Sequence, residues 1–172
     1  PAISARLLSA LLADGEHEIA CVVSNPDSPR GRSKKLVPTE VSALALEKGL
    51  PLLRPATLKK AAATPELAEF GVDLFVVFAY GRLLPRDVFE LPPCGTINLH
   101  ASVLPLLRGA SPIQSAVLAG FPETGWSVQF IEAGMDTGDV LSHATIPVDP
   151  DETAGELTER LVPVGIDLMR TT

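Results

Sequence analysis

Cysteine and histidine are both scarce in this sequence. Among 172 residues there are two cysteines and three histidines, at Cys21, Cys94, His17, His100 and His143. These residues are dispersed, without the close spacing of a metal site or a redox pair, so no metal ion is expected. Because both cysteines stand in apolar or proline-rich surroundings, we expect two buried free thiols.

The sequence also lacks long apolar segments and a leader. Although 46% of the residues are hydrophobic, no apolar run approaches the roughly 18 residues that a membrane-spanning helix needs. The first residues do not show the charged, apolar and small-residue order of a signal peptide. We therefore expect a soluble, cytoplasmic protein that forms a single domain over residues 1–172 and has no membrane partner.

Basic residues are outnumbered, with 14 lysines and arginines against 21 acidic residues and a formal net charge of −7. This balance argues against nucleic-acid binding over the whole surface, so a polyanionic partner would have to meet a local basic patch. Residues 25–37 have no periodicity and are expected to form a loop. Its cations are Arg30, Arg32, Lys34 and Lys35. They form either a solvated surface or a phosphate-binding arm.

Several catalytic and nucleotide-binding motifs are missing. There is neither a Gly-x-Gly-x-x-Gly run nor a Walker-type loop, so a dinucleotide or nucleoside triphosphate is not indicated. No Gly-x-Ser-x-Gly elbow surrounds Ser102, the one serine that invites a hydrolase interpretation. Its spacing to Pro105 favours a turn instead.

Helical and extended patterns alternate along the chain. We expect helices at residues 3–12, 39–49, 55–70, 111–120 and from 153, and strands at 18–24, 50–53, 74–78, 95–99, 126–131 and 140–148, the last two as a hairpin. The apolar run Leu74-Phe75-Val76-Val77-Phe78 is typical of a central parallel strand buried on both faces. Pro163 and Gly165 are expected to kink the last helix or end it early. The pattern predicts an α/β fold of three layers, with a mostly parallel sheet and helices on both faces.

The start of the chain is unusual for such a fold. The first residue is Pro1 rather than methionine, and a helical pattern follows it at once. We therefore expect the domain to lack its first strand and the chain to be a fragment.

A candidate site lies where one predicted strand ends. Asn98 and His100 are two residues apart, so on an extended chain they point to the same side. Ligands of α/β sheets bind beyond the carboxyl ends of the strands. Residues 132–139 form an acidic loop that by itself indicates a plain hairpin turn. Beside His100, however, its Asp136 would orient the imidazole and favour the protonated ring. An amide, an imidazole and a carboxylate without a nucleophilic serine or cysteine suit direct acyl transfer between bound partners.

Several motifs, taken in order, resemble one known family. They are Asn98-Leu99-His100-Ala101-Ser102-Val103-Leu104-Pro105, Arg108-Gly109-Ala110-Ser111-Pro112-Ile113-Gln114, Glu123-Thr124-Gly125, Gly134-Met135-Asp136-Thr137-Gly138-Asp139, Asn25-Pro26-Asp27, Gly31-Arg32-Ser33-Lys34-Lys35-Leu36 and Ala79-Tyr80-Gly81-Arg82-Leu83-Leu84-Pro85. These segments cover essentially the whole chain and resemble the formyltransferases that use 10-formyltetrahydrofolate. In detail they resemble the members that formylate methionyl-initiator tRNA. The resemblance implies a Rossmann-like domain, a folate co-substrate, no metal and a monomer.

The resemblance also implies roles for individual residues. It makes Asn98, His100 and Asp136 the catalytic trio. It assigns folate binding to Tyr80, Gly81, Arg82, Leu83 and Leu84 in one loop, and to Met135, Thr137, Gly138 and Asp139 in another. It assigns contact with the tRNA acceptor end to Arg32, Lys34 and Lys35.

The chain departs from the family pattern in places. Leu106 and Leu107 stand where the family usually has a basic or polar residue and then an aromatic one, and Ser33 replaces a loop glycine. The family's C-terminal β-barrel domain, which helps to hold tRNA, is absent after Thr172. This chain alone is therefore expected to bind tRNA poorly or to be inactive.

Three other functions are consistent with the sequence. A relative that formylates glycinamide ribonucleotide or an amino-sugar nucleotide would keep the trio and the folate loops without needing the basic arm. A hydrolase of 10-formyltetrahydrofolate would use water as the acceptor. The non-enzymatic alternative is a Rossmann-like interaction module that binds no folate.

Overall fold

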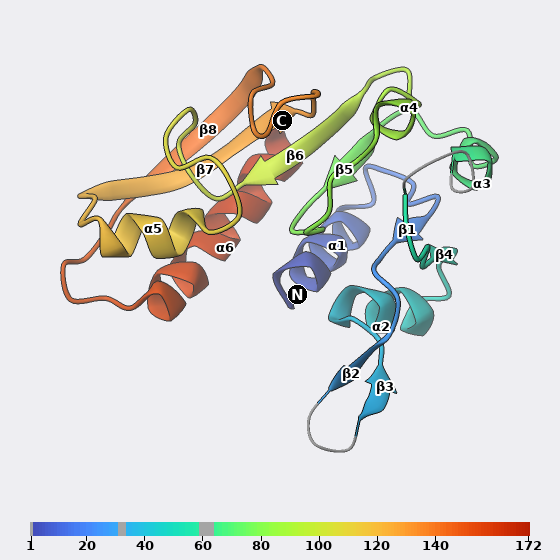
Figure 1. The fold of residues 1–172 in the computed structure, drawn as a ribbon, viewed down its shortest axis with the longest axis horizontal. Coiled ribbons are helices and arrows are strands. Elements are labelled where there is room, and N and C mark those ends of the chain that lie inside the picture. Colours follow the sequence, from blue (N-terminus) through green and yellow to red (C-terminus); the bar gives the residue numbers. More distant parts are fainter. Residues whose placement is uncertain (1, 31–33, 59–63) are drawn as a thin grey trace. The chain divides into compact units, whose positions relative to one another are not determined.

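The computed structural model describes residues 2–30, 34–58 and 64–172. The chain forms two compact units (Figure 1). The first unit comprises Pro1–Val72 and Arg82–Leu91, and the second comprises Asp73–Gly81 and Pro92–Thr172. The single domain expected over residues 1–172 stays a prediction.

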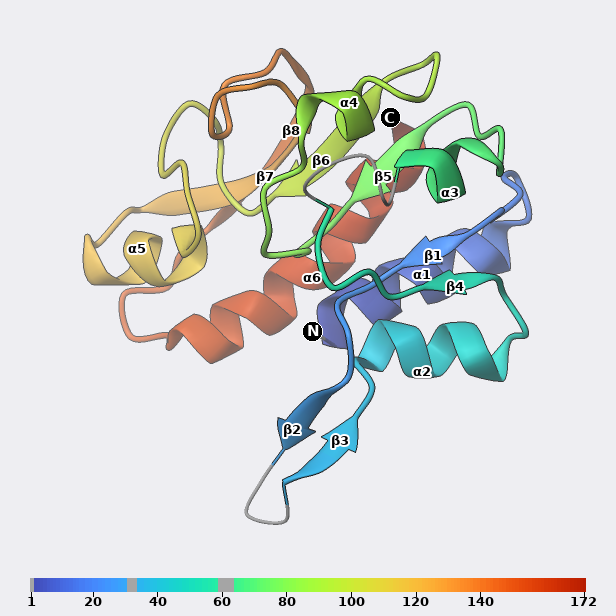
Figure 2. The ribbon, with the colours of Figure 1, turned by 45° about the vertical axis from the view of Figure 1, so that its right-hand side comes forward.

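The first unit contains a parallel pair of short strands. Its elements are α1 (Ala2–Asp14), β1 (Val22–Val23), β2 (Ser28–Arg30), β3 (Lys35–Val37), α2 (Glu40–Glu47), β4 (Leu52–Leu53), α3 (Thr64–Ala68) and α4 (Arg86–Phe89). β1 pairs with β4, and α2 packs on both strands and on α1 (Figure 2). Leu8, Val22 and Ala45 form the buried centre of this group. The predicted order of helix, strand, helix and strand is confirmed.

Two segments of this unit differ from their predictions. Residues 25–37, expected as a loop, contain the antiparallel hairpin of β2 and β3, with Ser28 opposite Val37. The loop prediction is wrong because this hairpin is held by backbone pairing and shows no apolar alternation. Within the described part of residues 55–70, the expected helix is found only at α3, since residues 55–58 and 69–70 are not helical. Residues 59–63 lie outside the described residues.

The second unit contains a four-stranded sheet in the order β5-β6-β7-β8. Its elements are β5 (Phe75–Val77), β6 (Thr96–His100), α5 (Pro112–Leu118), β7 (Glu123–Phe130), β8 (Val140–Pro147) and α6 (Ala154–Thr171). β5 and β6 are parallel, whereas β6–β7 and β7–β8 are antiparallel. The α/β class and the hairpin of the last two strands are confirmed.

β5 is less buried than its sequence indicates. Val76 is 41% exposed and Leu74 is 39% exposed, so burial on both faces is a wrong prediction. The reason is that β5 is the edge strand of its sheet, with β6 as its neighbour in the described structure. An edge strand has fewer neighbouring side chains to cover it.

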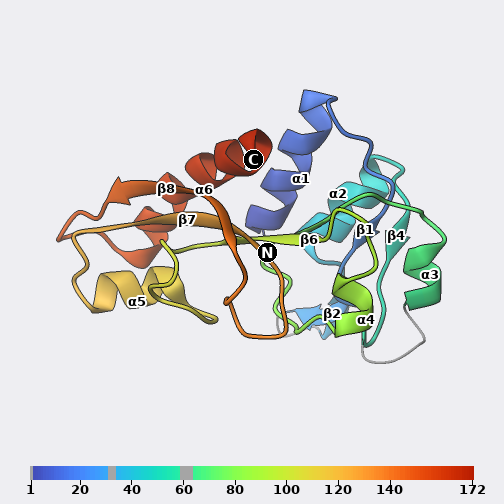
Figure 3. The same cartoon turned by 90° about the horizontal axis from the view of Figure 1, so that it is seen from above.

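The sheet of this unit has one apolar and one polar face along β6 and β7. The apolar face presents Ile97, Leu99, Trp126 and Val128, all at most 6% exposed. α6 packs on β7 and β8, while α5 lies on the other side of β7 (Figure 3). The opposite face carries Thr96, Asn98, His100, Ser127 and Gln129, which alternate with the apolar residues.

α6 continues past Pro163 and Gly165, so it does not end early, whereas the kink given as the alternative stays a prediction. It begins with a capping box in which Thr153 and Glu156 bond to each other's backbone N–H. It then continues through Pro163 to Thr171. Pro163 is exposed, whereas Gly165 is buried against the Trp126 indole. A Cβ added at Gly165 would lie only 2.7 Å from the nearest atom of that ring. Close packing on the sheet side therefore holds the helix together past the proline.

The described residues form no helix long and apolar enough to span a membrane. Within the same residues, no three or more His, Cys, Asp and Glu side chains gather as a metal site would require. Both cysteines are free thiols. Cys21 is half-buried, and burial raises the pKa of its thiol. Cys94 is exposed because it lies in the turn before β6, so the prediction that both thiols are buried is wrong.

Candidate active site

The end of β6 is covered by a tightly folded loop, residues 101–111. The Ser102 hydroxyl donates a 2.6 Å hydrogen bond to the Leu106 carbonyl, and the Leu106 N–H donates to the Val103 carbonyl. Ser102 is fully buried. The predicted turn is confirmed. The Ser102 hydroxyl holds the loop and is not placed as a nucleophile.

Ser127 of β7 fixes this loop to the sheet. It lies opposite His100 on the polar face. Its Oγ accepts a 3.0 Å hydrogen bond from the Leu104 N–H and donates a 2.8 Å bond to the Ser102 carbonyl. Ser127 was not foreseen from the sequence. The sequence does contain a signal for it: Ser127 stands between the apolar Trp126 and Val128, so alternation along the strand places it on the opposite, polar face with His100.

His100 meets an acceptor oxygen at each ring nitrogen. Its Nε2 lies 3.1 Å from the Leu107 carbonyl, and its Nδ1 lies 3.7 Å from Asp136 Oδ2. Because a carbonyl only accepts, Nε2–H is the donor in the first contact. The imidazole is 6% exposed, so its orientation is fixed by these two oxygens and by the sheet.

Asp136 reaches this histidine from the loop between β7 and β8. Its Oδ2 accepts a 2.7 Å hydrogen bond from the Gly109 N–H, and its Oδ1 accepts a 3.1 Å bond from Gln129 Nε2. Gly138 lets the loop fold back closely, because a Cβ there would lie 2.0 Å from the Phe130 carbonyl oxygen. Neither Gly109 nor Gln129 was foreseen as a partner of the carboxylate.

Asn98 completes the group from the same strand as His100. It is half-buried and lies opposite Gln129, on the polar face. Within the described residues its side-chain amide makes no hydrogen bond with the protein, so its N–H groups are available to a bound molecule. An amide donor, a fixed imidazole and a carboxylate can together stabilise a developing oxyanion and transfer a proton. The structure thus brings Asn98, His100 and Asp136 together, and their catalytic roles stay predictions.

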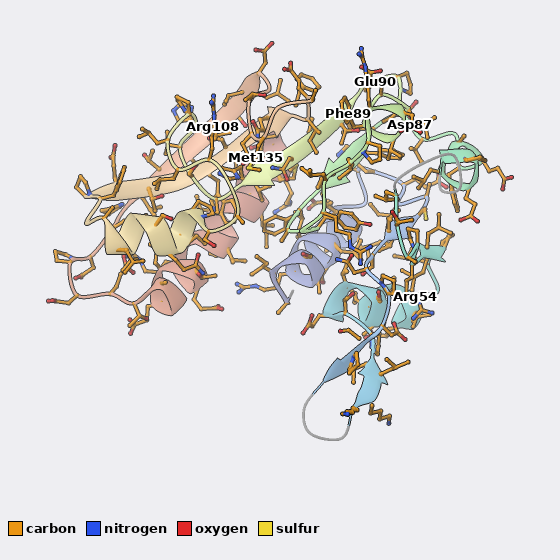
Figure 4. All side chains as sticks on the ribbon, in the orientation of Figure 1. Arg54, Asp87, Phe89, Glu90, Arg108 and Met135 are labelled. Atoms are coloured by element: carbon orange, nitrogen blue, oxygen red, sulfur yellow. The ribbon has the colours of Figure 1, made fainter. Side chains whose placement is uncertain are left out.

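The residues expected to bind folate belong to both units. Tyr80 and Gly81 lie in the second unit with Met135, Thr137, Gly138 and Asp139, whereas Arg82, Leu83 and Leu84 lie in the first. Met135 is 61% exposed, and its sulfur lies 3.8 Å from where a Cβ at Gly109 would be. Figure 4 shows it near Arg108. Arg82 donates a 2.7 Å hydrogen bond to the Ala56 carbonyl. The folate-binding role of these residues stays a prediction.

Two of the expected tRNA-binding residues are described: Lys35 begins β3, and Lys34 directly precedes it. Lys34 and Lys35 are exposed there, and Lys34 has a left-handed φ of 52°. Arg32 lies outside the described residues. The tRNA-binding role of all three stays a prediction.

A family model described as Formyl transferase matches residues 2–171. The chain belongs to the formyl transferase family. The family predicted from the motifs is therefore confirmed.

Curated members of the formyl transferase family are similar over the whole chain. The methionyl-tRNA formyltransferase of Symbiobacterium thermophilum is 46% identical over 172 residues, which are 100% of this chain and 52% of that protein. The methionyl-tRNA formyltransferase of Pseudomonas fluorescens strain SBW25 is 47% identical over 165 residues, 96% of this chain and 52% of that protein. The chain thus spans about half the length of the curated relatives it matches.

Two solved structures are similar to this chain in fold. Phosphoribosylglycinamide formyltransferase from Bacillus halodurans aligns with a TM-score of 0.80 at 19% identity, covering 97% of this chain and 85% of that chain. A formyltetrahydrofolate deformylase from Pseudomonas syringae aligns with a TM-score of 0.77 at 20% identity, covering 96% and 54%. At these identities the likeness concerns the fold alone, and it confirms the predicted Rossmann-like α/β class.

Proposed function

We propose that this protein transfers a formyl group from 10-formyltetrahydrofolate to the α-amine of methionyl-initiator tRNA. The observation that carries the proposal is the arrangement at the end of β6. There the His100 imidazole is held between two acceptor oxygens, beside the unengaged amide of Asn98. The curated relatives named methionyl-tRNA formyltransferase support the choice of acceptor.

The donor supplies an activated formyl carbon, and the residues of this chain act around it. As the amine attacks, a new carbon–nitrogen bond forms and negative charge develops on the formyl oxygen. The Asn98 N–H groups stabilise that charge, and His100 Nε2–H does so when it exchanges the Leu107 carbonyl for the formyl oxygen. The carbon–nitrogen bond to the folate then breaks, and the proton released by the amine passes through His100 to the departing folate nitrogen. Asp136 orients the imidazole and compensates its charge when it is protonated.

No nucleophilic side chain is needed in this mechanism. Ser102 and Ser127, next to the site, are both buried, and their hydroxyls donate hydrogen bonds to the Leu106 and Ser102 carbonyls. Direct transfer between two bound molecules depends instead on their mutual positioning. Because Asn98, His100 and Asp136 all come from one chain, the proposal requires a monomer only.

The two substrates would be held by residues outside the trio. For the folate we propose Tyr80, Gly81, Arg82, Leu83 and Leu84, together with Met135, Thr137, Gly138 and Asp139. For the acceptor end of the tRNA we propose Arg32, Lys34 and Lys35. The exposure of Lys34 and Lys35 supports a role in binding phosphates, since the chain as a whole carries a net charge of −7. An enzyme that modifies initiator tRNA would act in the cytoplasm.

An acceptor comparison tests the proposal. The full-length protein is incubated with 10-formyltetrahydrofolate and, in separate reactions, methionyl-initiator tRNA, glycinamide ribonucleotide, an amino-sugar nucleotide or no acceptor. Formylation of the tRNA alone is the expected result. Preference for either small amine would overturn the proposed acceptor, and release of formate without an acceptor would indicate a hydrolase. Failure to bind folate in calorimetry would leave a non-enzymatic interaction module.

A further inference from the structure

We propose that Gln129 is a positioning residue that holds the Asp136 carboxylate in place for the reaction at His100. This inference rests on the proposed formyl transfer. The supporting contact is the 3.1 Å hydrogen bond that Gln129 Nε2 donates to Asp136 Oδ1. The other oxygen of the same carboxylate faces His100 Nδ1 at 3.7 Å.

Gln129 is buried in an inner strand of the sheet. It lies in β7, between two neighbouring strands, and is 2% exposed. Asp136, in contrast, stands in a loop and has a left-handed φ of 51°, which is unusual for a residue with a side chain. Without an anchor on each oxygen, such a carboxylate could turn away from the imidazole. The Gly109 N–H anchors Oδ2, and Gln129 anchors Oδ1.

The amide orientation of Gln129 follows from its partner. An ionised carboxylate only accepts hydrogen bonds, so the NH₂ group of Gln129 has to face Asp136. Its Oε1 then remains buried and makes no hydrogen bond within the described residues. Leaving a buried carbonyl oxygen without a partner is unfavourable, and an apolar side chain of the same shape would avoid this. Stability alone therefore does not account for a glutamine here, whereas its donor to Asp136 does.

Gln129 has no access to solvent through which to bind a substrate directly. Its effect on the reaction therefore has to pass through Asp136. This gives a distinctive expectation: loss of Gln129 lowers kcat, leaves KM unchanged, and has no further effect once the Asp136 carboxylate is removed.

The test is a double-mutant cycle in the full-length protein, measured as formylation of methionyl-initiator tRNA. Gln129→Met keeps the size of the side chain and removes its donor. We expect it to lower kcat about ten- to hundredfold, with an unfolding temperature equal to or above that of the parent. In the Asp136→Ala background the same substitution should change kcat less than about twofold.

Thr124→Val is the matched control. Thr124 lies on the same strand, is 3% exposed, and also has a buried Oγ1 without a hydrogen bond in the described residues. Thr124→Val also removes a buried polar atom that has no partner, but at the end of β7 that lies far from Asp136. It should leave kcat unchanged and match Gln129→Met in its effect on unfolding temperature.

A second variant covers the case in which Gln129→Met does not fold. Gln129→Asn keeps the amide but shortens the side chain by one methylene, so its NH₂ no longer reaches Asp136; it should lose kcat like Gln129→Met. The inference is overturned if either folded variant keeps the kcat of the parent, or if the loss is equally large in the Asp136→Ala background. A parent that formylates no tRNA would instead overturn the proposed function.

Discussion

The indole N–H of Trp126 donates a 2.7 Å hydrogen bond to the Leu161 carbonyl, and this fixes the ring directly against Gly165. Replacing Gly165 by alanine would place a Cβ 2.7 Å from the ring of a residue that is 1% exposed. We expect Gly165→Ala to lower the free energy of unfolding by about 1 to 3 kcal/mol, because an extra methyl group in a packed core forces neighbouring atoms into strained positions. Chemical denaturation measures this loss.

Gly155→Ala is the control for this substitution. Gly155 lies in the first turn of the same helix, and a Cβ there would come no nearer than 3.7 Å to Thr153 Oγ1. Since alanine is the better helix former, this variant should be as stable as the parent or slightly more stable. Equal losses at both positions would contradict close packing as the cause.

Ser127 holds two backbone groups of the loop over the site. Ser127→Ala leaves the Leu104 N–H and the Ser102 carbonyl without their bonds to its Oγ. We expect a loss of about 1 to 3 kcal/mol in unfolding free energy and a lower formylation rate, because the same loop carries the Leu107 carbonyl that faces His100. Ser142→Ala, on the exposed hydroxyl that contacts Thr172, should stay within about 0.5 kcal/mol of the parent.

Asn98 offers the cleanest separation of activity from stability. Its amide has no protein partner in the described structure, so Asn98→Ala should unfold like the parent. The formylation rate should fall about a hundredfold, as for other donors to an oxyanion. His100→Ala should lose at least as much rate, whereas His17→Ala, at an exposed position of the first unit, should lose none. Near-normal turnover of both Asn98→Ala and His100→Ala would remove the catalytic assignment.

Gly109 combines an unusual backbone conformation with a bond to the site. Its φ is +102°, and its N–H donates to Asp136 Oδ2. Gly109→Ala should cost about 1 to 3 kcal/mol of stability through backbone strain and should also lower the formylation rate. Gly15→Ala, at a φ of +67° with no atom near its Cβ, should show the strain without the loss of rate. Steady-state kinetics beside thermal unfolding separates the two effects.

The capping box of α6 predicts a dependence of stability on pH. The backbone N–H of Thr153, and then its hydroxyl, lower the pKa of Glu156 below its ordinary value of 4.5. A depressed pKa stabilises the folded state above the pKa of the unfolded chain, and this stabilisation is lost as the pH falls through the folded-state pKa. The stability advantage of the parent over Glu156→Ala should therefore be full at neutral pH and shrink below pH 4.5. Thermal unfolding of both proteins across this pH range measures the difference, and an advantage that stays constant down to low pH would contradict the contribution of the capping box.

The sequence predicted the elements of the fold better than their environment. Alternating helical and extended patterns identified the α/β class, and the caps at Thr39 and Thr153 marked two helix starts. Exposure of Val76 was not predicted, because an apolar run does not reveal whether its strand is central or at an edge. An early end of α6 was predicted as the alternative to a kink for a similar reason, since the sequence does not reveal the contact between Gly165 and Trp126 in the part of the helix that follows Pro163.

The site was predicted in part for comparable physical reasons. Asn98 and His100 follow from the period of a strand, and Asp136 was suggested by its loop and by the family resemblance. Gln129 was missed because a polar residue at an alternating strand position usually faces water. Its burial depends on a loop that folds back over the sheet, which Gly138 permits by its lack of a side chain.

Alternation along β6 and β7 makes two kinds of selection act on neighbouring positions. Ile97, Leu99, Trp126 and Val128 are constrained by volume and hydrophobicity, whereas Asn98, His100, Ser127 and Gln129 are constrained by hydrogen bonding. Tolerance to substitution should therefore oscillate with a period of two residues along each strand. Insertion or deletion of a single residue within either strand would turn the apolar residues beyond it to the polar face and the polar residues to the apolar face. The length of each strand is therefore constrained by the core and by the site together.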